Sequence, residues 1–324
     1  MKPLITVILI VVVVPLLALT VIPVSRYAGA QHETLTMDDA ARRDVSGSFV
    51  RLSDGVTHYQ LGGATGGVTL VLIPGFSTPY MVWDPTYDGL TAAGVRVLRY
   101  DLFGRGWSDR PTARYDADFY DRQVSDLLNA LGVPGLVDVA GVSMGGPIAV
   151  TFAVRHPERV RRVLLFDPGY WPERPAPFKI RAPYVGEYNM AVSMAPRLAE
   201  SQWDDFVHPE RYPHYLDPYR EQMRYRGFRS ALLETLRNYL SKDVTGDFKR
   251  LGKSGKPVLL VWGKEDKDVP IAVADEVRAD IPQAEFHPID DAAHIPHYER
   301  PEVVNPIVLE FIRGYSGPPL RYDR

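Results

Sequence analysis

The chain has 324 residues, of which 45% are hydrophobic and 24% charged, and its formal net charge is −3. This composition is typical of a globular protein and provides enough chain for one large α/β domain with an insertion. The near-neutral balance offers no basic patch for nucleic acid, which we exclude as a partner. The absence of cysteine excludes a disulfide framework, a thiol nucleophile and a cysteine-ligated metal.

The N-terminal segment differs in composition from the rest of the chain. Residues 3–24 carry no charge and are rich in valine, leucine and isoleucine. As a helix this run would be roughly 33 Å long, which is enough to cross a bilayer. We therefore expect residues 1–25 to anchor the protein in a membrane, with the rest of the chain outside the cytoplasm. The small residues Ala28, Gly29 and Ala30 resemble a signal-cleavage site, so secretion after cleavage is the alternative.

After a polar segment at 26–46 that we interpret as a linker, short β-rich runs alternate with helical patterns. This alternation predicts an α/β fold, with a mostly parallel eight-stranded sheet and helices on both faces. The first two runs alternate polar and apolar residues around Asp54-Gly55, which indicates an antiparallel start. The expected strands are 48–52, 57–61, 68–73, 95–100, 136–140, 163–166, 258–262 and 285–288.

Helical periodicity predicts helices at 118–131, 147–155, 270–280 and 301–313. Between 167 and 257 the alternation of strands and helices lapses. A structureless loop of that length is improbable, so we expect a mainly helical cap at 169–250, inserted between core segments 47–168 and 251–316. The cap is rich in aromatic residues and methionine. We expect an apolar substrate pocket there, formed by Trp171, Tyr184 and Met190.

The pentapeptide Gly141-Val142-Ser143-Met144-Gly145 fits the G-x-S-x-G pattern. An expected strand precedes it and a helical pattern follows it, which is the context of a nucleophile elbow. A sharp strand-to-helix turn of this kind would present the Ser143 hydroxyl at the carboxyl edge of the sheet. We therefore expect Ser143 to be a catalytic nucleophile.

A serine nucleophile needs a base, and the base needs a carboxylate that orients it. Among eight histidines, His294 is the best placed, between the last expected strand and the C-terminal helix. His297 is its rival. Asp266 follows an apolar strand closely and is the expected carboxylate, with Asp167, after another strand, as the alternative.

The oxyanion of an acyl-transfer reaction needs two backbone N–H donors. We expect one from Met144, at the start of the helix after Ser143. The other should come from the loop after the strand at 68–73, where we choose Phe76. No metal-ligand spacing and no phosphate-binding loop is evident, so we expect neither a metal nor a cofactor.

These segments together resemble the α/β-hydrolase superfamily, in its lid-bearing branch of serine esterases and monoacylglycerol-lipase-like enzymes. The matching segments are LIPGF at 72–76, YDLFGRGWSDRP at 100–111, GVSMG at 141–145, WGKED at 262–266, and His294 followed by ERPE at 299–302. The order Ser, Asp, His is also that of this fold. Two departures stand out: Pro74 occupies the place of a usual histidine in the oxyanion loop, and Ala293 the place of a usual glycine.

The resemblance implies hydrolysis of carboxylic esters through an acyl-enzyme, with short or medium acyl esters or monoacylglycerol-like lipids as substrates. Alternatives on the same constellation are hydrolysis of carbon–carbon bonds, a proline-type aminopeptidase and a cofactor-free perhydrolase. A non-catalytic, membrane-tethered binding module is an alternative from another class. The sequence gives no basis for assigning an oligomeric state.

Overall fold

The computed structural model describes residues 14–314. The expected anchor at 1–25 therefore lies partly outside the described residues, and its described part belongs to helix α2 (Val14–Gly29). Within residues 14–314, no helix combines the length and the apolar character that crossing a bilayer would require. The C-terminal end of α2 lies against the cap, where the rings of Tyr27 and Tyr188 stack with their centroids 6.5 Å apart.

The segment that we expected to be a linker is docked onto the cap along part of its length. Leu35 forms a β-bridge with Tyr225. The Glu33 carboxylate accepts hydrogen bonds from the backbone N–H groups of Gly227 and Arg229. A short helix, α3 (Asp39–Arg42), follows, with Asp38 as its N-cap. The segment after α2 is therefore held against the folded domain.

The described residues build an eight-stranded sheet in the order β1-β2-β4-β3-β5-β6-β7-β8. Strands β1, β2 and β4 pair antiparallel, and every later pairing is parallel. The predicted antiparallel start and parallel remainder are thus confirmed. The strands are β1 (Ser48–Arg51), β2 (Val56–Gly62), β3 (Thr69–Ile73), β4 (Arg96–Tyr100), β5 (Val137–Val142), β6 (Val160–Phe166), β7 (Val258–Gly263) and β8 (Ala284–Ile289).

Helices cover both faces of the sheet because its central strands are apolar on both sides. In β3, Val71 and Ile73 pack toward one face, whereas Leu70 and Leu72 pack toward the other. The first face is covered by α5 (Ala117–Ala130), α6 (Gly145–Arg155), α12 (Thr245–Lys253) and α13 (Val273–Asp280). The second is covered by η2 (Tyr80–Trp83), α4 (Asp84–Ala92) and α15 (Pro301–Arg313), with the short α14 (Pro296–Glu299) beside them. Each large side chain buried there contributes about 1.5–3 kcal/mol to stability.

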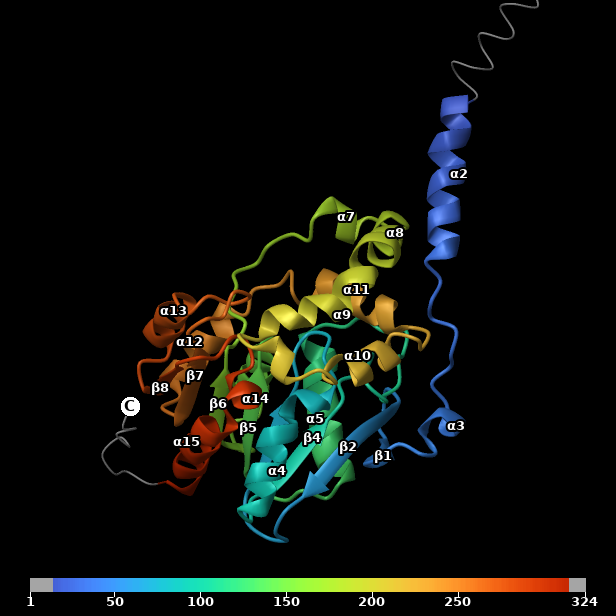
Figure 1. The fold of residues 1–324 in the computed structure, drawn as a ribbon. Helices are drawn as coiled ribbons and strands as arrows, with labels where there is room; N and C mark the ends of the chain where they lie inside the picture. The colour runs from blue at the N-terminus through green and yellow to red at the C-terminus, as the bar shows by residue number, and fades with distance from the viewer. Residues whose placement is uncertain (1–13, 315–324) are drawn as a thin grey trace, which may run out of the picture.

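A mainly helical insertion follows β6, and Figure 1 shows its helices gathered over one end of the sheet. Its helical segments are α7 (Phe178–Arg181), α8 (Val185–Asn189), η3 (Met190–Met194), α9 (Ala195–Ser201), η4 (Gln202–Asp205), η5 (Pro209–Arg211), α10 (Leu216–Gln222) and α11 (Phe228–Asn238). The expected cap boundary at 250 falls inside α12. Because Phe248 and Leu251 of α12 are buried against the core, this helix packs as part of the core.

Strand β6 and helix α4 show where the sequence-based expectation was incomplete. Strand β6 begins at Val160, three residues before the expected start at 163, because the charged Arg161 is accommodated within it. The Arg161 Nε atom donates to the Asp138 carboxylate of neighbouring β5 at 2.8 Å. Helix α4 was not expected, since its short sequence contains a proline and a glycine.

Candidate active site

Ser143 lies at the turn between β5 and α6 and has a positive backbone φ of 53°. Such a value is strained for a residue with a side chain. The flanking glycines make the turn possible, because a Cβ atom on Gly141 would lie 2.0 Å from the Gly145 carbonyl oxygen. A Cβ atom on Gly145 would lie 2.3 Å from the carbonyl oxygen of Ile73. The expected elbow geometry is therefore present.

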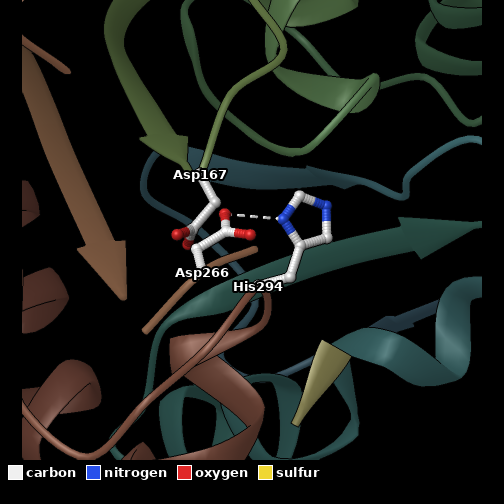
Figure 2. Close-up of side chains that lie close together, drawn as sticks. All are labelled: Asp167, Asp266 and His294. Atoms are coloured by element: carbon white, nitrogen blue, oxygen red, sulfur yellow. Dashed lines mark hydrogen bonds and ion pairs between the residues drawn. The ribbon is translucent and has the colours of Figure 1, made fainter. Parts of the chain in front are cut away.

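His294 precedes α14, and Asp266 follows β7. The His294 Nδ1 atom and the Asp266 Oδ2 atom are 2.8 Å apart, and both side chains are buried. Figure 2 shows this hydrogen bond. The Asp266 Oδ1 atom accepts from the backbone N–H groups of Asp268 and Val269, which fixes the orientation of the carboxylate. The structure thus brings two of the three expected residues into direct contact.

His294 also lines the same cavity as Ser143. Among the described residues, no hydrogen bond joins the Ser143 hydroxyl to the His294 ring. Such contacts are often long in unliganded enzymes and tighten when substrate binds.

The alternative histidines have other environments. The His297 ring is buried against Trp83 and Phe166, and its Nε2 atom is 3.0 Å from the Val82 carbonyl oxygen. Burial lowers the pKa of His297 to about 3. This histidine does not line the cavity that contains Ser143. His156 ends α6 and pairs with Asp121.

Burial on its own lowers the pKa of His294. The hydrogen bond to Asp266 and the negative charges of Asp266, Asp205 and Asp268 together outweigh this effect and raise the pKa of His294 to about 9. The site therefore stabilises the imidazolium form of His294. An imidazolium of this kind is what a serine mechanism produces when the base takes the serine proton.

Asp167, the alternative carboxylate, lies beside Asp266 at the end of β6 (Figure 2). It has a positive φ of 42°, and its Oδ1 atom accepts from the backbone N–H of Gly263 at 2.8 Å. Burial and the charge of Asp266 raise the pKa of Asp167 well above its ordinary value. A negative charge on Asp167 is therefore costly, and the hydrogen bond to His294 is made by Asp266.

One ligand atom from each of Asp167, Asp266 and His294 lies within 4.8 Å of the others. A metal ion would need separated ligand atoms around it. Asp266 and His294 are instead in direct hydrogen-bond contact, and burial disfavours a charge on Asp167. These three side chains therefore fit a hydrogen-bonded Asp266–His294 pair better than a metal centre.

The loop expected to supply an oxyanion donor passes directly beside the nucleophile, since a Cβ atom on Gly75 would lie 3.8 Å from the Ser143 hydroxyl oxygen. Among the described residues, none accepts a hydrogen bond from the backbone N–H of Phe76 or of Met144. Both N–H groups are thus free for a ligand. Met144 precedes the first residue of α6, where the positive end of the helix dipole adds to the effect.

The fully buried Arg105 holds the oxyanion loop in place. Its Nε atom donates to the Phe76 carbonyl oxygen at 2.7 Å. Its other nitrogens donate to the Phe103 carbonyl oxygen and the Thr235 hydroxyl. This anchor, which the sequence did not reveal, orients the loop in a chain that has Pro74 where a histidine is usual.

The cavity has a volume of about 160 Å³ and is bordered by the oxyanion loop, the elbow, His294 and the cap. Its polar lining is extensive. Besides Ser143 and His294, the polar residues are Ser77, Thr78, Ser201, Gln202, Asp205 and Asp268. The sequence analysis singled out none of these six, because isolated polar residues in loops and in the cap are usually solvated and carry no motif.

The structure brings none of the expected substrate-binding residues to this cavity. Met190 is buried in the cap interior. Tyr184 is 88% exposed. The Trp171 indole donates to the Lys242 carbonyl oxygen and packs edge-on against Tyr239. Aromatic and methionine content thus indicated the packing and the surface of the cap, and not the lining of the site.

The alpha/beta hydrolase fold family model matches residues 68–301, which include the elbow, Asp266 and His294. The chain belongs to this family. The match confirms the expected superfamily and supports the interpretation that the protein is a hydrolase. It does not assign the bond that this α/β hydrolase cleaves.

Relatives of this α/β hydrolase have names that indicate different substrates. A 2-hydroxy-6-oxononadienedioate/2-hydroxy-6-oxononatrienedioate hydrolase of Cupriavidus pinatubonensis is 27% identical over 82% of this chain and 94% of its own length. Lipase 3 of Moraxella is 28% identical over 72% of this chain and 73% of its own. The solved structure of a bacterial membrane phospholipase A has a TM-score of 0.68 at 24% identity, and covers 97% of this chain and 99% of that one.

Proposed function

We propose that this α/β hydrolase is a serine hydrolase that cleaves carboxylic esters through an acyl-enzyme. One observation carries the proposal: Ser143, on its strained elbow, borders the same cavity as His294, whose other ring nitrogen is held by Asp266. The small cavity favours short or medium groups over larger ligands, since pockets for drug-sized molecules measure about 300–1,000 Å³.

In the proposed reaction, His294 accepts the proton of the Ser143 hydroxyl as its oxygen attacks the ester carbonyl. The N–H groups of Phe76 and Met144 stabilise the tetrahedral oxyanion. His294 then gives the proton to the departing alcohol, which leaves Ser143 acylated. Water, deprotonated by His294, attacks the acyl-enzyme; the bond to the Ser143 oxygen breaks, His294 returns the proton to that oxygen, and the acid is released. Asp266 orients His294 and stabilises its imidazolium form throughout.

The charge of the cavity favours this reaction over hydrolysis of the substrates named for the Cupriavidus relative. The substrates in that relative's name are dioates, which carry two carboxylates. In this chain Asp205 and Asp268 line the cavity, and no described arginine or lysine does so. A dianionic substrate would therefore meet negative charge without a compensating cation, which costs binding energy.

A series of p-nitrophenyl esters tests the proposal. We expect activity on acetate to octanoate esters, with a clear optimum in chain length, and a loss of at least about 1,000-fold in Ser143→Ala. The variant should keep the circular dichroism spectrum and melting temperature of the wild type. Unchanged hydrolysis in a folded Ser143→Ala protein would remove Ser143 from the mechanism.

We also propose that the N-terminal segment associates the protein with a membrane, with the catalytic domain outside the cytoplasm, or directs its secretion. The uncharged run at 3–24 supports this. So do exposed apolar side chains on α2, at the start of α7 and around the start of α8, namely Val21, Ile22, Val24, Tyr27, Phe178, Tyr184 and Val185. Fractionation of cells should place the full chain in membranes, and deletion of 1–25 should release it. A full chain found only in the cytosol would contradict this proposal.

A further inference from the structure

The cavity beside Ser143 contains a carboxylate that the ester mechanism does not use. Asp205, at the end of the cap segment η4, is only 8% exposed and lines the cavity. Among the described residues, none donates a hydrogen bond to its carboxylate and none forms an ion pair with it. A buried carboxylate without a partner is costly, so its place in the cavity calls for a ligand.

Asp205 belongs to the same structural unit as the base. The backbone N–H of His294 donates to the Asp205 carbonyl oxygen at 3.1 Å, which ties η4 to the His294 loop. A second carboxylate, Asp268, borders the cavity two residues after Asp266. The His294 side of the cavity thus carries two carboxylates that are not needed to orient the imidazole.

We propose that the natural ester has an alcohol part with a positive charge, such as an ammonium group, which Asp205 and Asp268 bind. This inference rests on the proposed ester hydrolysis. The alcohol side follows from the mechanism: His294 donates its proton to the departing alcohol, so that part of the substrate lies toward His294. The acyl part and the carbonyl oxygen lie toward the elbow and the oxyanion loop. Asp205 is on the alcohol side because its carbonyl oxygen accepts from the His294 backbone N–H, and Asp268 because it lies in the loop of Asp266, the partner of His294.

The ionisation of Asp205 should also make the preference for a cationic ester depend on pH. Burial raises the pKa of Asp205 to about 7, the charge of His294 opposes the rise, and the charges of Asp268, Asp266 and Asp204 add to it. As the pH rises through 7, Asp205 gains its negative charge and attracts a cation more strongly. The preference for a cationic ester should therefore increase between pH 6 and pH 8.

An isosteric pair of esters tests the proposal with the full chain. Butyrylcholine and 3,3-dimethylbutyl butyrate have the same shape, and only the first carries a charge. We expect kcat/KM to be at least about tenfold higher for butyrylcholine at pH 8, a typical effect of one partly buried charge pair. In Asp205→Asn the ratio should fall to within about threefold of unity. In Asp204→Asn, which removes an exposed neighbouring charge that does not line the cavity, the ratio should stay near the wild-type value.

A binding measurement in the wild type needs no variant. Choline should protect Ser143 from a fluorophosphonate probe at a lower concentration than 3,3-dimethyl-1-butanol does. Equal rates for the two esters, or equal protection by the two alcohols, would overturn the proposal and leave ester hydrolysis intact. Faster hydrolysis of the neutral glycerol monobutyrate than of butyrylcholine would also overturn it, since the carboxylates would then be accepting hydrogen bonds from hydroxyls. Hydrolysis of none of these esters would instead count against the proposed function.

Discussion

Replacing Asp266 by asparagine removes the carboxylate that holds His294, and its clearest effect should be on the pH dependence. The pKa of His294 lies at about 9, against an ordinary value of 6.5. At about 1.4 kcal/mol per pH unit, this difference represents about 3–4 kcal/mol of preferential stabilisation of the imidazolium. Because only neutral His294 can accept the serine proton, kcat/KM of the wild type should rise with pH to a midpoint near 9.

In Asp266→Asn, burial dominates and the pKa of His294 should fall below its ordinary value. The midpoint should therefore move below about pH 6.5, and kcat should fall by about 10³–10⁴-fold because the imidazole loses its orientation. Initial rates with p-nitrophenyl butyrate from pH 5 to pH 10, corrected for spontaneous hydrolysis, measure both quantities. Asp268→Asn is the matched control in the same loop, and we expect it to lower the midpoint by less than Asp266→Asn does. A wild-type midpoint near 6.5, or the same midpoint in Asp266→Asn, would refute this account of His294.

Three further predictions concern the supports of the site. Gly145→Ala should lower the free energy of unfolding in urea by about 2–3 kcal/mol, because the new Cβ atom would lie 2.3 Å from the carbonyl oxygen of Ile73. In the control Gly246→Ala the nearest atom would be 3.5 Å away, so the free energy of unfolding should not fall. Asp167→Asn should raise the melting temperature more at pH 8 than at pH 4. A carboxyl group whose pKa is raised in the folded protein lowers the stability as the pH rises above 3.8, its pKa in the unfolded chain. An equal gain in melting temperature at pH 4 and pH 8 would contradict this. Arg105→Lys should lower kcat by about tenfold with little change in KM, because lysine cannot hold the Phe76 carbonyl in the same geometry. An unchanged kcat in steady-state assays would show that the oxyanion loop does not need the hydrogen bond from Arg105.

The sheet could be predicted because its signal is local. Apolar runs of strand length, separated by helical patterns, gave all eight strands with small errors at their ends. The largest error at a strand start, at β6, arose where Arg161 interrupts the apolar pattern. Its partner Asp138 is distant in sequence, and only the register of the sheet brings the two together.

The elbow could be predicted for the same reason, since Ser143 and its two glycines lie within one pentapeptide. Sequence spacing distinguishes Asp266 from Asp167 less clearly than it identifies the elbow, because both residues follow parallel strands at the same edge of the sheet. The structure distinguishes them by one hydrogen bond, from His294 to Asp266.

The residues that line the cavity could not be predicted from the sequence. The cap is built from short helices whose mutual packing depends on tertiary contacts, so its composition did not show which side chains face inward. Met190 fills the cap interior and Tyr184 faces outward, while the polar Gln202 and Asp205 reach the cavity. Which polar side chains of the cap reach the cavity becomes visible only when the contacts of each atom are known.

Reaction with a fluorophosphonate probe tests the central claim most directly. Intact-protein mass spectrometry of the labelled wild type, followed by peptide mapping, should show a single adduct on Ser143. The adduct should be absent in Ser143→Ala and should form far more slowly in His294→Ala. A folded wild-type protein that remains unlabelled, or one labelled at another residue, would contradict the account.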